Sequence, residues 1–256
     1  MCPASIPDPR HTRHVWHGAV GMVRDVLFPR GCAGCDRPDT VLCEDCLHMF
    51  SGCRERILGG EPMVRVWSAA IYQGLVRHAV LGWKDHDDVE LDTPLMHVVA
   101  EVTKHGLLHC LDRAANVYDG NAAVAVIPVP SSSASIRRRG RYHTLPLAYA
   151  VASALRSDGI NARVSRLLVH TAGGRKSVQQ ISPAQRMQRV SGHIVANARI
   201  EAYGAGDGAV LVDDIVTTGA TLKECAYALR RQGISVLGAI VLADAVVPRY
   251  DDDCNG

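Results

Sequence analysis

The stretch Val210-Leu211-Val212-Asp213-Asp214-Ile215-Val216-Thr217-Thr218-Gly219-Ala220-Thr221 decides the fold of this 256-residue chain. Its apolar start is typical of a short buried strand, and two acids follow the strand directly. A turn of small and hydroxyl residues then opens a helix, which we expect over residues 220–232. In open α/β sheets, ligands bind at the carboxyl ends of strands, and helix N-termini favour anions. The stretch therefore predicts a site that holds an anion beside two carboxylates.

The side chains of this stretch suit a sugar phosphate. Asp213 and Asp214 can each accept a hydrogen bond from one hydroxyl of a ribose diol, and they can lie near a bound Mg²⁺. The turn that we expect to hold a phosphate consists of Thr217, Thr218, Gly219, Ala220 and Thr221. The alternative is that these residues only cap a helix. Two acids, three threonines and a glycine in register after a buried strand favour a binding site. The Gly-Lys-Ser/Thr of a Walker loop is absent.

Strands and helices alternate on both sides of this stretch. The hydrophobic pattern predicts strands over residues 64–72, 122–129, 162–169, 210–212 and 236–243, and helices over 145–155 and 220–232. Helical patterns also follow Gly74 and run from Pro94 to Leu111. Such alternation predicts an α/β fold with a parallel sheet flanked by helices.

Two Cys-x-x-Cys pairs precede this region. Cys32 and Cys35 are separated by seven residues from Cys43 and Cys46. Two such pairs complete a tetrahedral structural zinc site, whereas a thioredoxin-like redox site needs one pair in another context. Free buried thiols are the remaining alternative, and Cys53 is a spare that could replace a ligand. We therefore expect an N-terminal lead over residues 1–27, a small zinc module over 28–60 and the α/β domain over 61–256.

The charges are unevenly distributed. Residues 131–190 contain eleven Lys or Arg and one acid, although the formal net charge of the whole chain is only +2. A basic middle on a near-neutral protein points to an anionic partner. Guanidinium groups bind pyrophosphate well, so Arg137, Arg138 and Arg139 are the candidate pyrophosphate ligands. The alternative is an exposed basic start of a helix.

The apolar runs are far shorter than the ~20 residues of a membrane-spanning helix. The N-terminus lacks the apolar core of a secretory signal. We expect a cytoplasmic protein with reduced thiols, because an odd number of cysteines with a clustered quartet argues for metal and not for a disulfide framework. Nothing in the sequence indicates the oligomeric state.

Residues 210–221 resemble the fingerprint of type I phosphoribosyltransferases. The resemblance implies that Asp213 and Asp214 bind the ribose 2′- and 3′-hydroxyls, and that the turn from Thr217 to Thr221 holds the 5′-phosphate. The expected ligand is phosphoribosyl diphosphate with Mg²⁺, or a nucleotide.

Together with the cysteine quartet, the chain from about Leu27 onward resembles the ComF family of competence proteins. The matching segments are Leu27–Cys35, Leu42–Cys46, Tyr72–Arg77 with Lys84, Ile127–Pro130, Arg137–Gly140, and Gln179 with Arg186. Two departures lie where pyrophosphate or the second substrate is expected. The family often has Phe-Asn-Gln where this chain has Arg141-Tyr142-His143, and Asn where it has Arg189.

Two functions remain open. In the first, the protein is a transferase in which Asp213 and Asp214 hold the sugar and Arg137 and Arg139 hold the leaving pyrophosphate. His143 is then a weak candidate for a general base. In the second, implied by the resemblance, the protein handles single-stranded DNA during uptake, with the basic middle on the DNA backbone and the ribose-phosphate site as a sensor. The acceptor substrate is not indicated.

Overall fold

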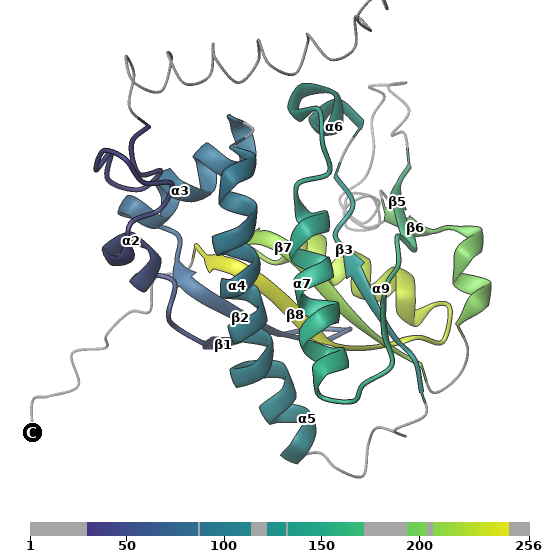
Figure 1. The fold of residues 1–256 in the computed structure, drawn as a ribbon. Coiled ribbons are helices and arrows are strands. Elements are labelled where there is room, and N and C mark those ends of the chain that lie inside the picture. Colours follow the sequence, from purple (N-terminus) through teal and green to yellow (C-terminus); the bar gives the residue numbers. More distant parts are fainter. Residues whose placement is uncertain are drawn as a thin grey trace, which may run out of the picture.

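The computed structural model describes residues 30–86, 88–113, 122–131, 133–171, 194–203 and 207–245. A six-stranded sheet in the order β1-β2-β8-β7-β3-β4 forms its centre (Figure 1). The strands are β1 (Arg54–Leu58), β2 (Val64–Ile71), β3 (Val124–Pro128), β4 (Ala162–Val164), β7 (Gly208–Val216) and β8 (Ser235–Asp244). β1 pairs with β2 antiparallel, and every other neighbouring pair is parallel. The predicted α/β class with a mostly parallel sheet is confirmed.

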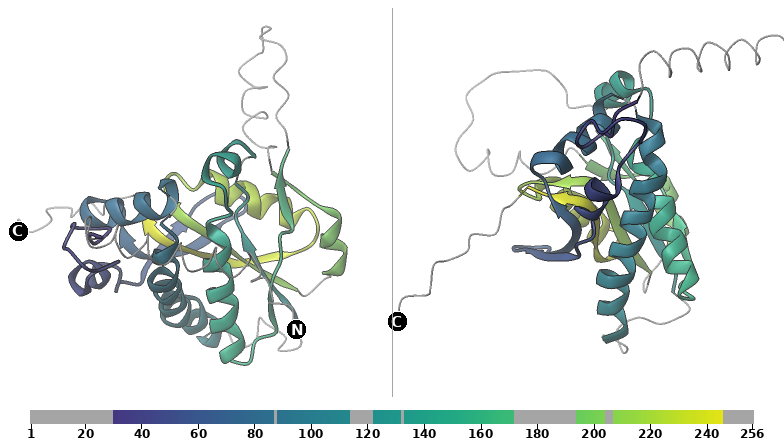
Figure 2. Two further views of the ribbon diagram at one scale, coloured as in Figure 1. Left: turned by 45° about the horizontal axis from the view of Figure 1, so that its top comes forward. Right: turned by 60° about the vertical axis from the view of Figure 1, so that its left-hand side comes forward.

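Both faces of the sheet are covered, because the strands carry apolar residues at successive positions. In β7, Val210 and Val212 belong to one buried cluster, while Leu211 between them belongs to the other. The first cluster is covered by α3 (Gly74–Asp85), α4 (Asp92–Val102) and α7 (Thr144–Ser157). α9 (Ala220–Arg230) covers the second cluster on the opposite face (Figure 2). The sheet is thus the middle layer of three.

The connections change direction between β3 and β7. From β3 the chain passes through α7 to β4 on one side, and from β7 it passes through α9 to β8 on the other. Such a switch point leaves a crevice at the carboxyl ends of the two strands, where ligands bind in open α/β sheets.

Shorter elements complete the described structure: α2 (Glu44–His48), η1 (Val89–Leu91), the π-helix η2 (Thr103–Leu108), α5 (His109–Arg113), α6 (Ser133–Arg139) and η3 (Ala198–Ala202). A separate antiparallel hairpin pairs β5 (Leu168–His170) with β6 (Ile194–Ala196). No helix of the described segments is long and apolar enough to cross a membrane.

Several elements differ from the sequence-based expectation. The strand expected over residues 162–169 is split, because β4 belongs to the central sheet whereas β5 turns away into the hairpin. β7 continues to Val216, so the two acids lie inside the strand and not after it. The basic residues Arg137, Arg138 and Arg139 end helix α6 and do not form the start of a helix. β1 and β6 were not predicted. The expected lead over residues 1–27 lies outside the described residues.

Candidate functional site

A cavity of about 540 Å³ lies at the switch point. Asp213 and Asp214 from β7 line it, together with Thr217 and Thr221 from the following turn and helix. Val129, which follows β3, forms part of the opposite wall. The sheet topology therefore brings both predicted acids and two of the predicted threonines to one hollow.

Asp214 is a buried carboxylate held by two basic side chains. It forms an ion pair with Lys84 of α3, and its Oδ2 lies 3.0 Å from Nε2 of His143 at the start of α7. Although burial opposes the charged form, His143 and Lys84 hold the pKa of Asp214 below its usual value. The other ring nitrogen of His143 lies 3.4 Å from Nη1 of Arg139, which can only donate. With Nδ1 as the acceptor from Arg139, the Nε2–H of neutral His143 donates a hydrogen bond to Asp214 Oδ2.

Asp213 lies in the opposite electrostatic situation. Burial, and then the neighbouring charge of Asp214, raise the pKa of Asp213 well above its usual value. Its Oδ1 accepts a hydrogen bond from the Asp214 amide at 2.9 Å. Asp213 also raises the pKa of the buried Cys225 thiol on α9, after the larger effect of burial. Among the described residues, Lys84 and His143 form ion pairs with Asp214, and no ion pair is formed by Asp213, although the charge of Lys84 also favours the ionised form of Asp213.

The turn between β7 and α9 is fixed by its backbone. Gly219 has φ +77°, a left-handed conformation that side chains rarely adopt, and a Cβ on it would meet Leu58 Cδ1 at 2.4 Å. The Ala220 amide donates to Thr218 Oγ1 at 3.3 Å. Arg56 of β1 donates to the Thr217 carbonyl at 3.0 Å and pairs with Asp244 at 2.7 Å. Glycine is therefore required here by the fold itself, before any ligand arrives.

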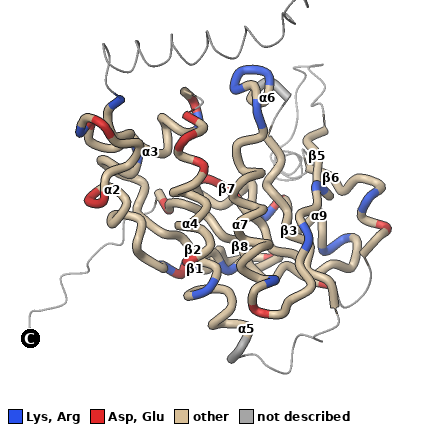
Figure 3. Tube along the Cα trace, viewed as in Figure 1, with Lys and Arg blue, Asp and Glu red and all other residues tan. Residues whose placement is uncertain are grey.

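The three predicted pyrophosphate ligands lie in the last turn of α6, where Figure 3 shows basic residues. Two of them contact Asp85, the single acid of α3. Arg138 Nη2 and Arg139 Nε each lie 3.2 Å from Asp85 Oδ1. Arg139 lines the cavity and its side chain is only 10% exposed, whereas Arg137 and Arg138 are exposed and do not line it. Arg141, which follows α6, forms a hydrogen-bonded ion pair with Asp92 at 2.8 Å.

Sequence reasoning missed several residues of the cavity wall. Tyr72 follows β2, His170 ends β5 and Glu224 lies one turn into α9. Tyr72 and His170 come from segments far from residues 210–221, whereas Glu224 lies three residues after Thr221 on the same helix. Tyr72 begins a segment that resembles the ComF family, but no local pattern indicated His170 or Glu224. Gln179, Arg186 and Arg189 lie outside the described residues.

The four cysteines of the two Cys-x-x-Cys pairs converge at one point. Their sulfurs all lie within 4.8 Å of one another, and those of Cys35 and Cys43 are 3.6 Å apart. The Cys43 amide donates to Cys32 Sγ at 3.3 Å. Gly34 allows this approach, because a Cβ at that position would lie 2.7 Å from Cys46 Sγ. Cys53 lies apart, with its sulfur 3.9 Å from the Val102 carbonyl.

The electrostatics of this cluster fit a cation. Burial opposes ionisation of Cys32, yet the backbone amides of Cys43, Cys35 and Gly34 lower its thiol pKa to about 6. Burial and the neighbouring thiols raise the pKa of Cys46. A positive ion between the four sulfurs would favour their thiolate forms, because opposite charge stabilises an ionised thiol. Such a four-sulfur set is the donor set of a closed structural zinc site.

Residues 141–254 match the family model of the phosphoribosyl transferase domain. The matched segment contains the two acids and the turn that follows them, and it begins after the cysteine cluster and α6. The comparison with curated proteins gave no match.

Similar solved structures include phosphoribosyltransferases. The UMP synthase of Leishmania donovani is 19% identical with a TM-score of 0.27, over 61% of this chain and 24% of that one. An adenine phosphoribosyltransferase is 8% identical with a TM-score of 0.33, over 78% and 88% of the two chains. The adenine phosphoribosyltransferase of Thermoanaerobacter pseudethanolicus is 16% identical with a TM-score of 0.30, over 78% and 86%.

The domain match over residues 141–254 and the position of the acids at the switch point of a parallel sheet support a phosphoribosyltransferase-type protein.

Proposed function

We propose that the protein binds phosphoribosyl diphosphate with Mg²⁺ at the switch-point cavity and transfers the phosphoribosyl group to a nucleophile. One observation carries the proposal: Asp213, Asp214, Thr217 and Thr221 line one hollow at the carboxyl ends of β3 and β7. Carboxylates suit the ribose diol, and the start of α9 suits the 5′-phosphate.

The two acids have different roles in this proposal. Asp214 is held ionised by Lys84 and His143, so it is a ready acceptor for a ribose hydroxyl. A nearby cation or a hydroxyl donor stabilises the ionised carboxylate of Asp213, whose pKa is raised in the free protein. His143 acts as a positioning residue, since its ring is fixed between Arg139 and Asp214. The amides and hydroxyls of the turn Thr217, Thr218, Gly219, Ala220 and Thr221 hold the phosphate.

Departure of pyrophosphate leaves positive charge on the ribose ring. The carboxylates beside the ring stabilise this charge, and Mg²⁺ and arginines stabilise the leaving group. We assign the leaving group to Arg137, Arg138 and Arg139, with Arg139 innermost because it lines the cavity. Binding there requires pyrophosphate to compete with Asp85 for Arg138 and Arg139.

The finer assignment is to a ComF-type protein with structural zinc on Cys32, Cys35, Cys43 and Cys46. The division at residue 61 stays a prediction, and β1, which lies before it, already pairs with β2 in the central sheet. The cytoplasmic location stays a prediction, and the cysteines of the described segments form no disulfides with one another.

The single-stranded DNA function is the weaker candidate. It depends on the arginines around α6, and Arg138, Arg139 and Arg141 are already paired with Asp85 and Asp92. These acids offset part of the positive charge around α6, and this lowers its attraction for an extended phosphate backbone. We therefore keep the transferase as the proposed function.

Titration calorimetry with magnesium phosphoribosyl diphosphate tests the proposal. Asp213→Asn keeps the shape of the side chain and removes its charge, so we expect affinity to fall about tenfold, as for one charge-assisted hydrogen bond. Asp158→Asn, an exposed acid at the end of α7, is the matched control and should bind like the wild type. Equal affinities of the wild type and Asp213→Asn would refute the assignment.

A further inference from the structure

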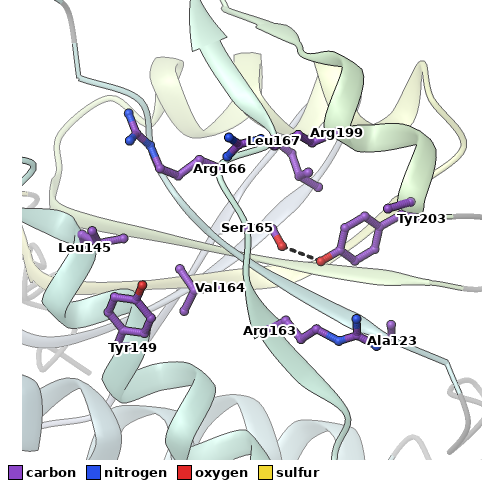
Figure 4. A pocket seen from close by; sticks show the side chains of 11 residues that line it. Ala123, Leu145, Tyr149, Arg163, Val164, Ser165, Arg166, Leu167, Arg199 and Tyr203 are labelled. Atoms are coloured by element: carbon purple, nitrogen blue, oxygen red, sulfur yellow. Dashed lines mark hydrogen bonds between the residues drawn. The ribbon is translucent and has the colours of Figure 1, made fainter.

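A second hollow of about 550 Å³ lies beside β4, at the edge of the central sheet. The residues that line it are entirely different from those of the switch-point cavity. Its walls come from β4, the segment that joins β4 to β5, the helix η3 and the side of α7 (Figure 4). It is therefore a separate site, and its volume is in the range of small-ligand pockets.

The charges that line this hollow are all positive. Arg163 comes from β4, Arg166 from the segment after it and Arg199 from η3. No carboxylate is among the lining residues, and none of these arginines forms an ion pair with an acid in the described segments. The acid next to this wall, Asp207, accepts a hydrogen bond from the Ala123 amide at 2.7 Å. This contrasts with Arg138, Arg139 and Arg141, which are neutralised by Asp85 and Asp92.

Aromatic rings lie beside these charges. Tyr149 of α7 lines the hollow and is 54% exposed, so one face of its ring is open. Tyr203 is fixed by a hydrogen bond of 2.5 Å between its hydroxyl and Ser165 Oγ (Figure 4). The guanidinium of Arg166 lies 4.6 Å from the centre of the Tyr142 ring, which restrains it. The hollow thus combines arginines that form no ion pair within the described segments with aromatic rings from the surrounding elements.

We propose that this hollow is a second ligand site, which binds a nucleoside phosphate. The guanidinium groups of Arg166 and Arg199 lie on the same side of the hollow in Figure 4 and hold the phosphate, because planar guanidinium matches phosphate oxygens and is always charged. The exposed ring of Tyr149 stacks on the base, an interaction that tolerates any base. The site goes beyond the proposed transferase function and does not depend on it.

Calorimetry with AMP and UMP, one purine and one pyrimidine nucleotide, tests the proposal. In Arg166→Gln/Arg199→Gln we expect AMP and UMP to bind about tenfold more weakly or worse at this site, since charge-assisted contacts are lost. Both arginines are exposed, so the variant should fold normally, which a thermal melt checks. Arg231→Gln, an exposed arginine at the end of α9, removes the same charge elsewhere and should bind like the wild type.

The switch-point cavity could also take a nucleotide, so the two sites must be separated. The arginine variant should keep its affinity for magnesium phosphoribosyl diphosphate, whereas Asp213→Asn should keep the nucleotide binding that the arginines support. Nucleotide binding that is unchanged in the arginine variant, or weakened equally in Arg231→Gln, would overturn the proposal. Loss of all nucleotide binding in Asp213→Asn would overturn it as well, because the only nucleotide site would then be the switch-point cavity.

Discussion

Asp213 and Asp214 are adjacent in the chain, and their surroundings push their pKa values in opposite directions. Lys84 and His143 stabilise the charge on Asp214, while burial and that same charge destabilise ionised Asp213. A carboxyl that is costly to ionise in the free protein is an expected feature of a binding site, because function is favoured there over stability.

A stability measurement can show this cost. The folded-state pKa of Asp213 is raised, so its contribution to stability is complete below the unfolded pKa of about 3.9 and is lost as pH rises toward the folded pKa. Asp213→Asn does not lose stability in this way, because an amide does not ionise. We therefore expect the variant to exceed the wild type in unfolding free energy by about 1 kcal/mol or more at pH 7, with a smaller gap at pH 5.

Urea unfolding of both proteins at the two pH values is the measurement. Asp158→Asn again serves as the control, and its pH dependence should follow the wild type. If the gap between Asp213→Asn and the wild type were constant between pH 5 and pH 7, the Asp213 carboxyl would not be strained in the free protein.

At the scale of single residues, the sequence indicated those site residues that lie close together in the chain. The two acids, the threonine turn and the cysteine pairs each lie in one short segment, so their spacing alone indicated a shared chemistry. Tyr72 and His170 reach the same cavity from two distant segments. Their positions depend on how the strands pair, which local patterns do not specify.

At the scale of elements, the turn into α9 has a second reason for its glycine. A Cβ at Gly219 would be strained by the positive φ and would also meet Leu58 of β1. The expectation from sequence was that small residues serve the approach of the phosphate. The structure shows that this turn is also packed against the strand at the edge of the sheet.

A comparison of Gly219→Ala with Gly159→Ala separates backbone strain from the contact with Leu58. We expect Gly219→Ala to lower the unfolding free energy by about 1–3 kcal/mol, because strain and a clash add. Gly159→Ala is the matched control, since Gly159 has φ +82° with nothing within 4 Å of the added Cβ, so it measures strain alone. Chemical denaturation of both variants is the test. Should Gly219→Ala lose no more stability than Gly159→Ala, contact with Leu58 would have no part in the choice of glycine.

The predicted helices and most strands have their counterparts because their apolar periodicity is strong. Boundaries differed where tertiary contacts decide them. β7 extends through both acids because β8 continues to pair with it as far as Asp244. The expected strand over residues 162–169 breaks after Val164, since the Ser165 amide makes the last contact with β3 and the chain then enters the hairpin.

At the scale of the whole molecule, the cysteine cluster and the transferase-type domain share one core. Ala33, Val41 and Leu42, from around the cysteines, pack against the buried cluster that also contains residues of β2, α3, α4 and α7. Phe50, which follows α2, is buried in that cluster. The cysteine segment therefore covers the face from which Lys84 of α3 reaches Asp214.

This arrangement predicts that zinc stabilises more than its own loop. We expect one zinc ion per chain, bound by Cys32, Cys35, Cys43 and Cys46. A ligand that binds only the folded state adds ~4 kcal/mol when its free concentration is a thousand times its Kd. Removal of zinc by a chelator should therefore lower the melting temperature of the protein and also weaken binding of phosphoribosyl diphosphate, because α3 carries Lys84.

Elemental analysis, thermal melting and calorimetry before and after chelation are the measurements. Cys53→Ser, outside the cluster, is the control that should keep its metal. Protein purified without chelator that holds no zinc, with four reactive thiols in the folded state, would contradict the assignment. Loss of zinc without any change in melting would instead show that the cluster does not support the shared core.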